Sequence, residues 1–453
     1  MFQKYLNSWS LLPVICFIFF ITPVVIVISS LFGDYSDNWS HLYNYVLGSY
    51  IKNSIYLVSG VLILVTIIGV STAWLVTNYD FFCKNILEWA LILPLAVPPY
   101  ILAYTFTGLF DTYGTANNLV RDIFNLSNEF TLFPKVRNVP GAIIVFSFTL
   151  YPYVYLVSRM AFINQSRSIL ESGRTLGLNR LEVFYRLAVP MIRPAIIAGL
   201  MLVAMETLSD FGAVDHFAIS TFTTGIFRTW YGMYDIHTAK QLASLLLIIA
   251  IMFIIAEKYS RKNADYSFAG SVFRQFNPLK LSGFKNFLAF LFCFIPIFIG
   301  FILPILELSY WAFNYKLDFF NERFITTAWN SFYLAIISAF LCTCLAIIIN
   351  FSVRYKSNEV LKFLSSFLTV GYAVPGIILA IGVMQLLTFI DASFVGKYFK
   401  FLLTGSLIGL ILAYVIKSYA LASSTIESGY QRVNIRLDDV AKSLKSSGWS
   451  LLS

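Results

Sequence analysis

Two carboxylates inside an apolar stretch are the residues of this chain best suited to chemistry. Glu206 and Asp210 lie four positions apart, so on a continuous helix they would share one face. Carboxylates at membrane depth are costly and usually face a cavity or a partner. This pair could therefore line a path and attract a cation. Alternatively, the two side chains could hydrogen-bond neighbouring helices, or a backbone that is broken near Gly212.

The second candidate is a polar, amphipathic stretch, residues 163–194, between two long apolar runs. Its residues 168–176 are compatible with a helix, and Gly177 is suited to the left-handed conformation that ends one. A second short helix could follow. Pro190 would then occupy the first turn of the next element, where its missing N–H does no harm. The pattern predicts a helix-turn-helix on the membrane surface; the alternative is a solvated connector without a partner.

The elements that must position these residues are transmembrane helices. The chain has 453 residues, of which 58% are hydrophobic and 12% charged, a composition outside the range of soluble globular proteins. Apolar runs of about eighteen residues or more recur, each long enough to cross a bilayer as a helix. Strands would need alternation, so we predict an all-α polytopic membrane protein with about ten spans. The predicted spans are 11–31, 53–77, 86–110, 139–162, 195–218, 239–257, 286–310, 330–353, 361–390 and 401–424.

Charge predicts the orientation of these spans. Segments 163–194 and 257–285 are rich in Lys and Arg, whereas segments 32–52, 111–138 and 219–238 are balanced or acidic. Positively charged loops stay inside, so both basic segments and the N-terminus are predicted to be cytoplasmic. The first run is long for a signal peptide and lacks a clear cleavage motif, which favours an uncleaved helix. The net charge of +9 is interpreted as a topology signal and not as a nucleic-acid footprint.

The chain also repeats itself. N-S-I-Y-L begins at Asn53 and N-S-F-Y-L at Asn330, while A-V-P ends at Pro98 and again at Pro375. The offset is 277 residues in both cases (330 − 53 and 375 − 98). It spans an even number of predicted helices, so the two repeats run parallel. The predicted domains are a first repeat, a cytoplasmic linker and a second repeat, at residues 1–256, 257–285 and 286–453.

Pro98 and Pro375 interrupt apolar helices at matching places. In lipid, such breaks are tolerated where a cavity or a neighbouring helix satisfies the freed carbonyls. We predict that these prolines are kinks that shape a central path. The alternative is that they are packing kinks without a gating role.

The polar loop carries a recognisable pattern. Glu171-Ser-Gly-Arg-Thr-Leu-Gly177 is followed at a fixed distance by Leu187-Ala-Val-Pro190. This resembles the conserved cytoplasmic loop of ABC importer permeases, E-A-A-x3-G-x9-I-x-L-P, with every spacing matched. In that family the loop forms a coupling helix, which docks in a groove of the ATPase subunit and passes its motion to the pore. The resemblance implies ATPase-coupling roles for Glu171, Ser172, Gly173, Gly177 and Pro190, and for Asp439 and Ala441 in the second repeat.

The second coupling loop, which begins at about residues 427–453, matches the first less well. Asp439 stands where the first loop has Glu171, and Lys445 stands where it has Gly177. A left-handed conformation at Lys445 would be strained, so the turn and the docking of the ATPase there are expected to differ. The sequence stops before the expected proline and two further helices. We therefore expect a C-terminally truncated second repeat; the alternative is a ten-helix variant.

Two stretches within residues 205–230 carry a narrower resemblance. They read E-T-L-S-D-F-G and T-F-T-T-G-I-F-R-T-W. Ferric-iron permeases of the same family have E-T-L-A-D-F-G and T-F-T-T-G-I-Y-R-x-W, so only Ser209 and Phe227 differ. This resemblance implies ferric iron as cargo, and the carboxylates of Glu206 and Asp210 would be suitable hard ligands in a translocation path.

The family implies a pore-forming subunit rather than an enzyme. The sequence contains no G-x4-G-K-S/T loop and no paired nucleophile and base, so ATP hydrolysis is expected in a separate subunit and no cofactor on this chain. The implied partners in the bacterial inner membrane are a dimer of cytoplasmic ABC ATPases, a periplasmic substrate-binding protein and membrane lipid, with no nucleic acid. Scattered histidines predict no metal site. They are His41, His216 and His237.

Other functions remain open. Permeases for thiamine, sulfate, phosphonate or polyamine share the coupling loop. An ion-coupled secondary transporter could also contain repeats with broken helices. That class favours inverted repeats, however, and it leaves the register from Glu171 to Pro190 unexplained. A membrane-embedded enzyme lacks any candidate site.

Overall fold

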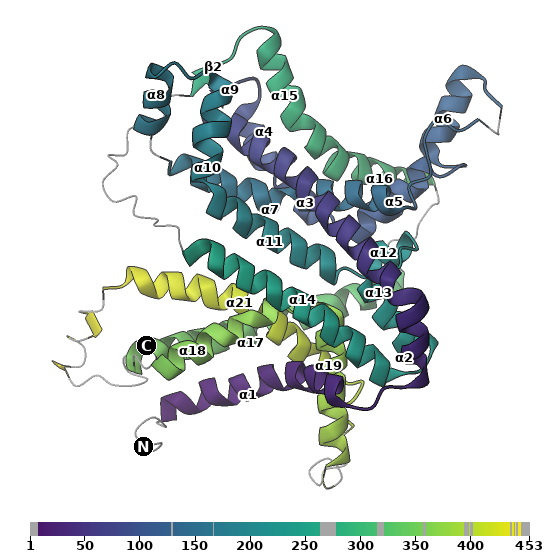
Figure 1. The fold of residues 1–453 in the computed structure, drawn as a ribbon, viewed down its shortest axis with the longest axis vertical. Helices are drawn as coiled ribbons and strands as arrows, with labels where there is room; N and C mark the ends of the chain where they lie inside the picture. The colour runs from purple at the N-terminus through teal and green to yellow at the C-terminus, as the bar shows by residue number, and fades with distance from the viewer. Residues whose placement is uncertain are drawn as a thin grey trace. The chain divides into compact units, whose positions relative to one another are not determined.

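The computed structural model describes residues 8–127, 130–165, 167–262, 278–314, 321–356, 359–393, 398, 402–434, 437–438, 440 and 443–444. Within these ranges the chain is helical apart from loops and one pair of two-residue strands (Figure 1). The predicted all-α class is therefore confirmed. Helices satisfy their backbone hydrogen bonds internally, which apolar surroundings require.

The elements up to the predicted linker are α1 (Ser8–Ser29), η2 (Ser30–Phe32), α2 (Asp37–His41), η3 (Leu42–Val46), α3 (Leu47–Asn78), β1 (Tyr79–Asp80), α4 (Lys84–Ala90), η4 (Leu93–Ala96), α5 (Pro99–Phe110), α6 (Thr115–Phe124), α7 (Val139–Ile163), α8 (Arg167–Thr175), α9 (Arg180–Val183), η5 (Phe184–Ala188), α10 (Val189–Met191), α11 (Arg193–Ser209), α12 (Gly212–His216), α13 (Phe222–Phe227), η6 (Arg228–Gly232) and α14 (Ile236–Lys262). The later elements are β2 (Leu279–Lys280), α15 (Phe284–Ile297), η7 (Phe298–Ile302), α16 (Leu303–Asn314), α17 (Glu322–Lys356), α18 (Glu359–Leu368), η8 (Thr369–Ala373), α19 (Gly376–Ala392) and α21 (Leu407–Arg432).

The number of membrane spans agrees with the prediction. In the described ranges, 7 helices are long and apolar enough to cross a membrane, or up to 10 if each of three bent helix pairs is one span. Two of the bends follow the matching prolines. The chain turns by 90° before α5, directly after Pro98, and by 114° before α19, directly after Pro375. The predicted kinks are therefore full breaks, each directly after one of the two matching prolines.

Contacts between residues divide the chain into two compact units. One comprises Met1–Ser36, Met233–Leu247 and Asp318–Ser453, and the other comprises Asp37–Gly232 and Ile248–Leu317. Each unit therefore combines helices from both predicted repeats. The first unit joins α1 to α17, α18, α19 and α21, and the second joins α15 and α16 to the helices between α2 and α13. The predicted repeats describe similarity in the order of elements along the chain, whereas the two units describe which residues are in contact. The units therefore do not test the repeats, which stay a prediction.

In the smaller unit, α1 packs against α18 and α19, and α17 packs against α21. The backbones of α1 and α19 approach closely, because a Cβ on Gly382 would lie 2.5 Å from the carbonyl oxygen of Pro23. The rings of Phe20 and Tyr419 meet edge to face with their centroids 5.6 Å apart. Apolar helices in membranes pack by such close contacts between small and aromatic residues.

In the larger unit, the end of the predicted linker is joined to the segment after α3. Strand β1 pairs in parallel with β2, with Tyr79 opposite Leu279 and Asp80 opposite Lys280. The Leu281 amide donates to the carbonyl of Asp80 at 2.9 Å. The segment just before α15 is therefore held by backbone hydrogen bonds to the segment after α3.

The central contact of the larger unit is between α3 and α7. Gly69 of α3 lies against the α7 backbone, where an added Cβ would be 2.9 Å from the Cβ of Val154 and 3.0 Å from the amide of Tyr155. A glycine at this point lets two helices approach closely, as at other small-residue contacts in membranes.

Gly69→Leu is expected to lower the melting temperature of the detergent-solubilised protein by about 5 °C or more. The larger side chain must push α3 away from α7, because the nearest atoms belong largely to a backbone that cannot rotate aside. Gly48→Leu is the matched control on the same helix, since nothing lies within 4 Å of a Cβ added there. Equal melting temperatures for the two variants would contradict the close α3–α7 contact.

Candidate functional site

The first coupling loop, residues 163–194, forms two short helices joined by a tight turn. Gly177 ends α8 with a φ of 90°. The Leu178 amide donates to the carbonyl of Gly173 at 3.1 Å, and the Gly177 amide donates to that of Arg174 at 3.0 Å. These two hydrogen bonds form a Schellman motif. The predicted left-handed turn at Gly177 is therefore confirmed.

The second helix of the loop begins with a capping box. The Asn179 side chain accepts from the amide of Glu182, and the Glu182 side chain accepts from that of Asn179, both at 2.9 Å. Sequence reasoning missed this cap, although Asn followed three residues later by Glu is its usual signal. The helical path continues through η5 into α10, where Pro190 lies in the first turn as predicted.

The small residue and the first apolar residue of the pattern contact each other. Gly173 is buried, and a Cβ added there would lie 2.4 Å from Cδ1 of Leu187. A larger residue would therefore separate α8 from η5. Glu171 and Ser172 are exposed. Gly173 thus explains one spacing of the motif by packing, while the two exposed residues leave their side chains available to a partner.

Aromatic packing fixes the loop to the spans. The ring of Trp74, near the end of α3, lies 5.1 Å from that of Phe162 on α7 and 5.2 Å from that of Phe184 on η5. Nε2 of the buried Gln165 donates to the carbonyl of Ala188 at 3.2 Å. These contacts therefore connect the loop directly to α3 and α7. Trp74 could not be linked to the loop from its sequence position.

Three large apolar side chains of the loop face solvent. Leu176 is 84% exposed, Leu181 69% and Tyr185 67%. Exposed apolar side chains that gather on one polar loop mark an interaction surface. We call Leu176, Leu181 and Tyr185 the loop surface. Glu171, in the same loop, is also exposed.

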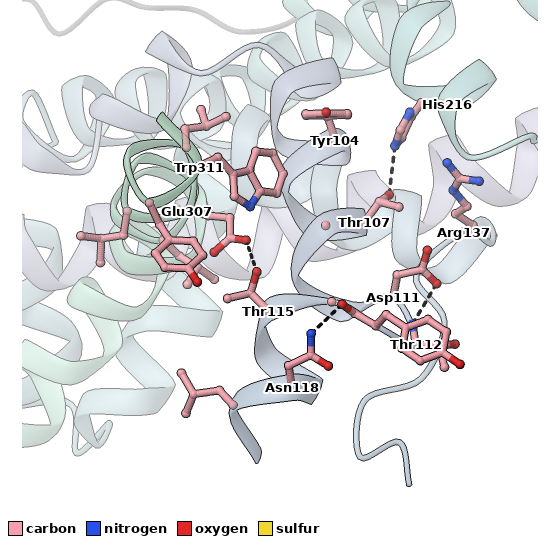
Figure 2. A pocket seen from close by; sticks show the side chains of 18 of the residues that line it. Tyr104, Thr107, Asp111, Thr112, Thr115, Asn118, Arg137, His216, Glu307 and Trp311 are labelled. Carbon is pink, nitrogen blue, oxygen red and sulfur yellow. Dashed lines mark hydrogen bonds between the residues drawn. The ribbon is translucent and has the colours of Figure 1, made fainter. Parts of the chain in front are cut away.

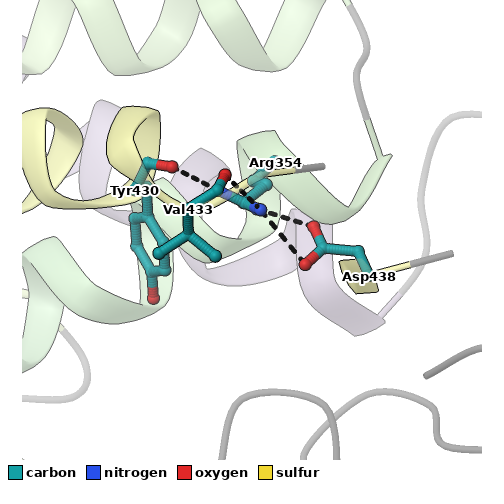
Figure 3. Close-up of polar contacts among 4 residues, drawn as sticks. All are labelled: Arg354, Tyr430, Val433 and Asp438. Atoms are coloured by element: carbon teal, nitrogen blue, oxygen red, sulfur yellow. Dashed lines mark hydrogen bonds and ion pairs between the residues drawn. The ribbon is translucent and has the colours of Figure 1, made fainter. Parts of the chain in front are cut away.

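The second coupling loop is only partly described, and Asp439 and Ala441 lie outside the described residues. Immediately before them, Arg354 at the end of α17 binds Asp438 (Figure 3). Its Nε lies 2.6 Å from Oδ2 of Asp438, and its Nη2 lies 3.1 Å from Oδ1.

The same guanidinium donates to the backbone carbonyls of Tyr430 and Val433, at the end of α21. The side chains of Arg354 and Asp438 are 13% and 19% exposed. We call this group of four residues the Arg354 latch. It holds the start of the second loop against two helices, and sequence reasoning missed it.

The structure corrects the prediction for the paired carboxylates. Helix α11 ends at Ser209, and Asp210 follows it with an extended backbone (φ −69°, ψ 134°). Oδ1 of Asp210 accepts from the amides of Ala213 at 2.9 Å and Val214 at 3.4 Å, so it caps α12. The predicted helix through residue 218, with Glu206 and Asp210 on one face, is therefore wrong. For Asp210 the structure matches the alternative interpretation, in which the side chain hydrogen-bonds a backbone that is broken near Gly212.

The threonines that follow form hydrogen bonds to the backbone at the break after α11 and at the start of α13. Thr223 Oγ1 donates to the carbonyl of Asp210 at 2.7 Å. The Thr221 amide donates to Thr224 Oγ1 at 2.8 Å and completes a capping box on α13. The stretch that resembles the ferric-iron permeases therefore builds helix ends. Glu206 is half-buried on α11.

A polar pocket of about 1340 Å³ lies in the larger unit, between α5, α6, α12 and α16 (Figure 2). Thr115 Oγ1 donates at 2.5 Å to Oε1 of Glu307, which is 5% exposed. His216 Nε2 and Thr107 Oγ1 are 3.0 Å apart. The charged and phenolic lining residues are Asp111, Asp122, Glu307, Arg137, Tyr104, Tyr113 and Tyr310.

Sequence reasoning missed Glu307, although a lone carboxylate within an apolar run is itself a signal. It gave His216 no ligand role. Among the residues that the structure describes, no three His, Cys, Asp or Glu side chains form a group that could hold a metal ion. The pocket therefore offers an acidic, oxygen-rich surface without a preformed metal site.

Comparison with known proteins gives one family. Residues 65–256 match the model described as the binding-protein-dependent transport system inner membrane component. The chain is 26% identical over 385 residues to the Fe(3+)-transport system permease protein FbpB 2 of Haemophilus influenzae, covering 83% of this chain and 69% of that protein. It is 24% identical over 467 residues to the ferric transport system permease protein FbpB of Actinobacillus pleuropneumoniae, covering 97% and 66%.

The molybdenum transport system permease protein ModB of Escherichia coli strain K12 is 27% identical over 185 residues, covering 40% of this chain and 78% of that protein. The chain spans 66 to 72% of the length of the ferric relatives. The family model covers the first coupling loop, and the ferric relatives align along 83 to 98% of the chain. Residues 65–256 are therefore similar to the inner membrane components of binding-protein-dependent transport systems, and most of the chain is similar to ferric transport permeases.

Proposed function

We propose that this chain is the permease subunit of a bacterial, ATP-driven importer that moves ferric iron across the inner membrane. The alignment with ferric permeases along 83 to 98% of the chain carries the proposal. The molybdenum and sulfate permeases align over 33 to 42% of it. The acidic pocket supports a cationic cargo, because three carboxylates and one arginine line it.

In this proposal the N-terminus and both coupling loops are cytoplasmic, and each loop docks on one subunit of an ATPase dimer. The loop surface around Leu176 and Leu181, with the exposed Glu171, would contact the first ATPase subunit. ATP binding and hydrolysis there would displace α8 and η5. The aromatic contacts of Trp74 would carry this displacement into α3 and α7.

The breaks at Pro98 and Pro375 would allow the half-helices on either side to move separately during alternating access. A periplasmic binding protein would deliver the cargo on the opposite side from the coupling loops. Glu206 and Asp210 would contribute negative charge to the path, Asp210 while it also caps α12. An oxyanion importer is the second candidate, since molybdenum and sulfate permeases match part of the chain.

Uptake of radioactive iron by cells that carry Glu206→Gln together with Asp210→Asn tests the proposal. Asparagine caps a helix about as well as aspartate does, so the double variant should fold while it loses both charges. We expect iron uptake to fall by about tenfold, equivalent to about 1.4 kcal/mol, at an unchanged protein level. Asp210→Ala is the control for the cap, because it should also lower the amount of folded protein.

Uptake at the wild-type rate by the double variant would remove the two carboxylates from the path. If the wild-type protein transported radioactive molybdate or sulfate but no iron, the proposal of a ferric importer would be rejected in favour of an oxyanion importer.

A further inference from the structure

Helix α6 buries two polar side chains and exposes its large apolar ones, which is the reverse of the usual arrangement. Asn117 and Arg121, one turn apart, are 1% and 5% exposed. Leu119, Ile123 and Phe124 are 54%, 63% and 68% exposed. A surface helix normally turns its apolar stripe towards the core, so this helix presents to its surroundings the face that water would disfavour.

Hydrogen bonds keep α6 in this orientation. Arg121 donates from Nη2 to the carbonyl of Thr112 at 2.6 Å, from Nε to that of Phe130 at 2.8 Å, and from Nη1 to Oδ1 of Asn118 at 2.9 Å. Oδ1 of Asn117 accepts from the amide of Leu132 at 3.1 Å. The segments before and after the helix are therefore bound to its polar face. The exposure of the apolar face is built into the fold, because turning α6 over would leave the buried Arg121 charge without these acceptors.

A partner protein fits this face better than a lipid surface. Helices that lie on membranes usually carry Lys and Arg on their polar face, where these residues meet the headgroups. The only basic residue of α6 is Arg121, and its guanidinium is buried among three acceptors. Figure 1 shows α6 at the end of its unit away from α8. With the first coupling loop inside, this end faces the compartment from which cargo arrives.

The neighbouring pocket adds a charge requirement. Asp122 of α6 lines this pocket. Asp111, Glu307 and Arg137 line it as well (Figure 2). A protein that covers the apolar face would bring its own surface over this acidic opening. We propose that α6 is the docking surface for the cargo-delivering binding protein, which covers Leu119, Ile123 and Phe124 and places a basic side chain over the acidic pocket.

This inference rests on the proposed function, and a binding measurement tests it separately. The complete transporter is placed in lipid nanodiscs, and the dissociation constant of its purified, iron-loaded binding protein is measured. Leu119→Ala with Ile123→Ala, and separately Asp122→Lys, are each expected to weaken binding by about tenfold or more. Ile63→Ala with Ile67→Ala is the matched control on α3, because these isoleucines have the same spacing and are 61% and 53% exposed. It should leave binding unchanged.

A photocrosslinking amino acid in place of Ile123 gives a second readout. Crosslinks to the binding protein support the surface, whereas crosslinks to lipid both with and without that protein overturn it in favour of a membrane contact. Unchanged affinity in the α6 variants also overturns the inference, while iron uptake by the wild type would leave the proposed function intact. Failure of the wild-type transporter both to bind this protein and to take up iron would overturn both proposals.

Discussion

Gly173→Val is expected to lower cargo uptake by about tenfold without changing the amount of protein in the membrane. A Cβ at this position would already lie 2.4 Å from Cδ1 of Leu187. Valine adds two methyl groups that the rotation of one leucine cannot accommodate, so α8 must separate from η5. The loop surface, with Leu176 on one side of the turn and Leu181 on the other, would lose its shape. Iron uptake and cargo-stimulated ATP hydrolysis in reconstituted vesicles measure the effect.

A double-mutant cycle with smaller changes isolates this contact. Gly173→Ala alone should reduce uptake less than valine does, because the end of Leu187 is flexible. Leu187→Ala removes the obstructing atoms, so uptake by the Gly173→Ala variant should largely recover in its presence. Residues in contact show such non-additive effects, and distant ones do not. Additive losses would mean that Gly173 and Leu187 act independently, and the packing explanation of this spacing would be wrong.

Arg354→Met is expected to release the chain after Tyr430, so that protease cleaves residues 433–440 at least about tenfold faster in membrane vesicles with this side exposed. The change leaves the carboxylate of Asp438 and two helix-end carbonyls without their donor. Removing one partner of a buried ion pair typically costs about 3 kcal/mol or more, and the 13% and 19% exposures of these side chains reduce that figure only partly.

Lys362→Met is the matched control for the Arg354 latch. Lys362 pairs with Glu359 at 2.9 Å, but these side chains are 49% and 88% exposed, and an exposed pair contributes little. Cleavage should therefore stay at the wild-type rate. Exchanging the charges, with Arg354→Asp and Asp438→Arg together, should restore part of the protection. If Arg354→Met and Lys362→Met were cleaved equally slowly, the Arg354 latch would not hold the second loop.

Local signals were sufficient for much of the fold. The apolar runs are long enough to define spans, because a bilayer imposes a minimum length on each helix. Gly177 ends a helix since only a residue without a Cβ adopts its backbone conformation freely. Pro98 and Pro375 mark breaks because proline lacks the amide that a helix requires. Each of these effects acts within a few residues of its cause.

The remaining features depend on contacts between distant residues. The spacing of Glu206 and Asp210 indicated a shared face only on the assumption that the helix continues, and the side chain of Asp210 is what caps the next helix. Arg354 reaches Asp438 across 84 positions, which no local pattern reveals. Helix α6 shows the same limit, because an amphipathic pattern does not say which face is buried.

Each compact unit contains helices from both halves of the chain. This arrangement has a consequence for how the protein must be made. Neither half, cut at the linker, would contain all of the segments of one unit: α1 packs with helices of the later half, and α15 and α16 pack with those of the earlier half. Two separately synthesised halves would have to meet before either could complete its fold. Covalent fusion raises their mutual concentration to about the millimolar range, so assembly no longer depends on how abundant each half is in a crowded bilayer.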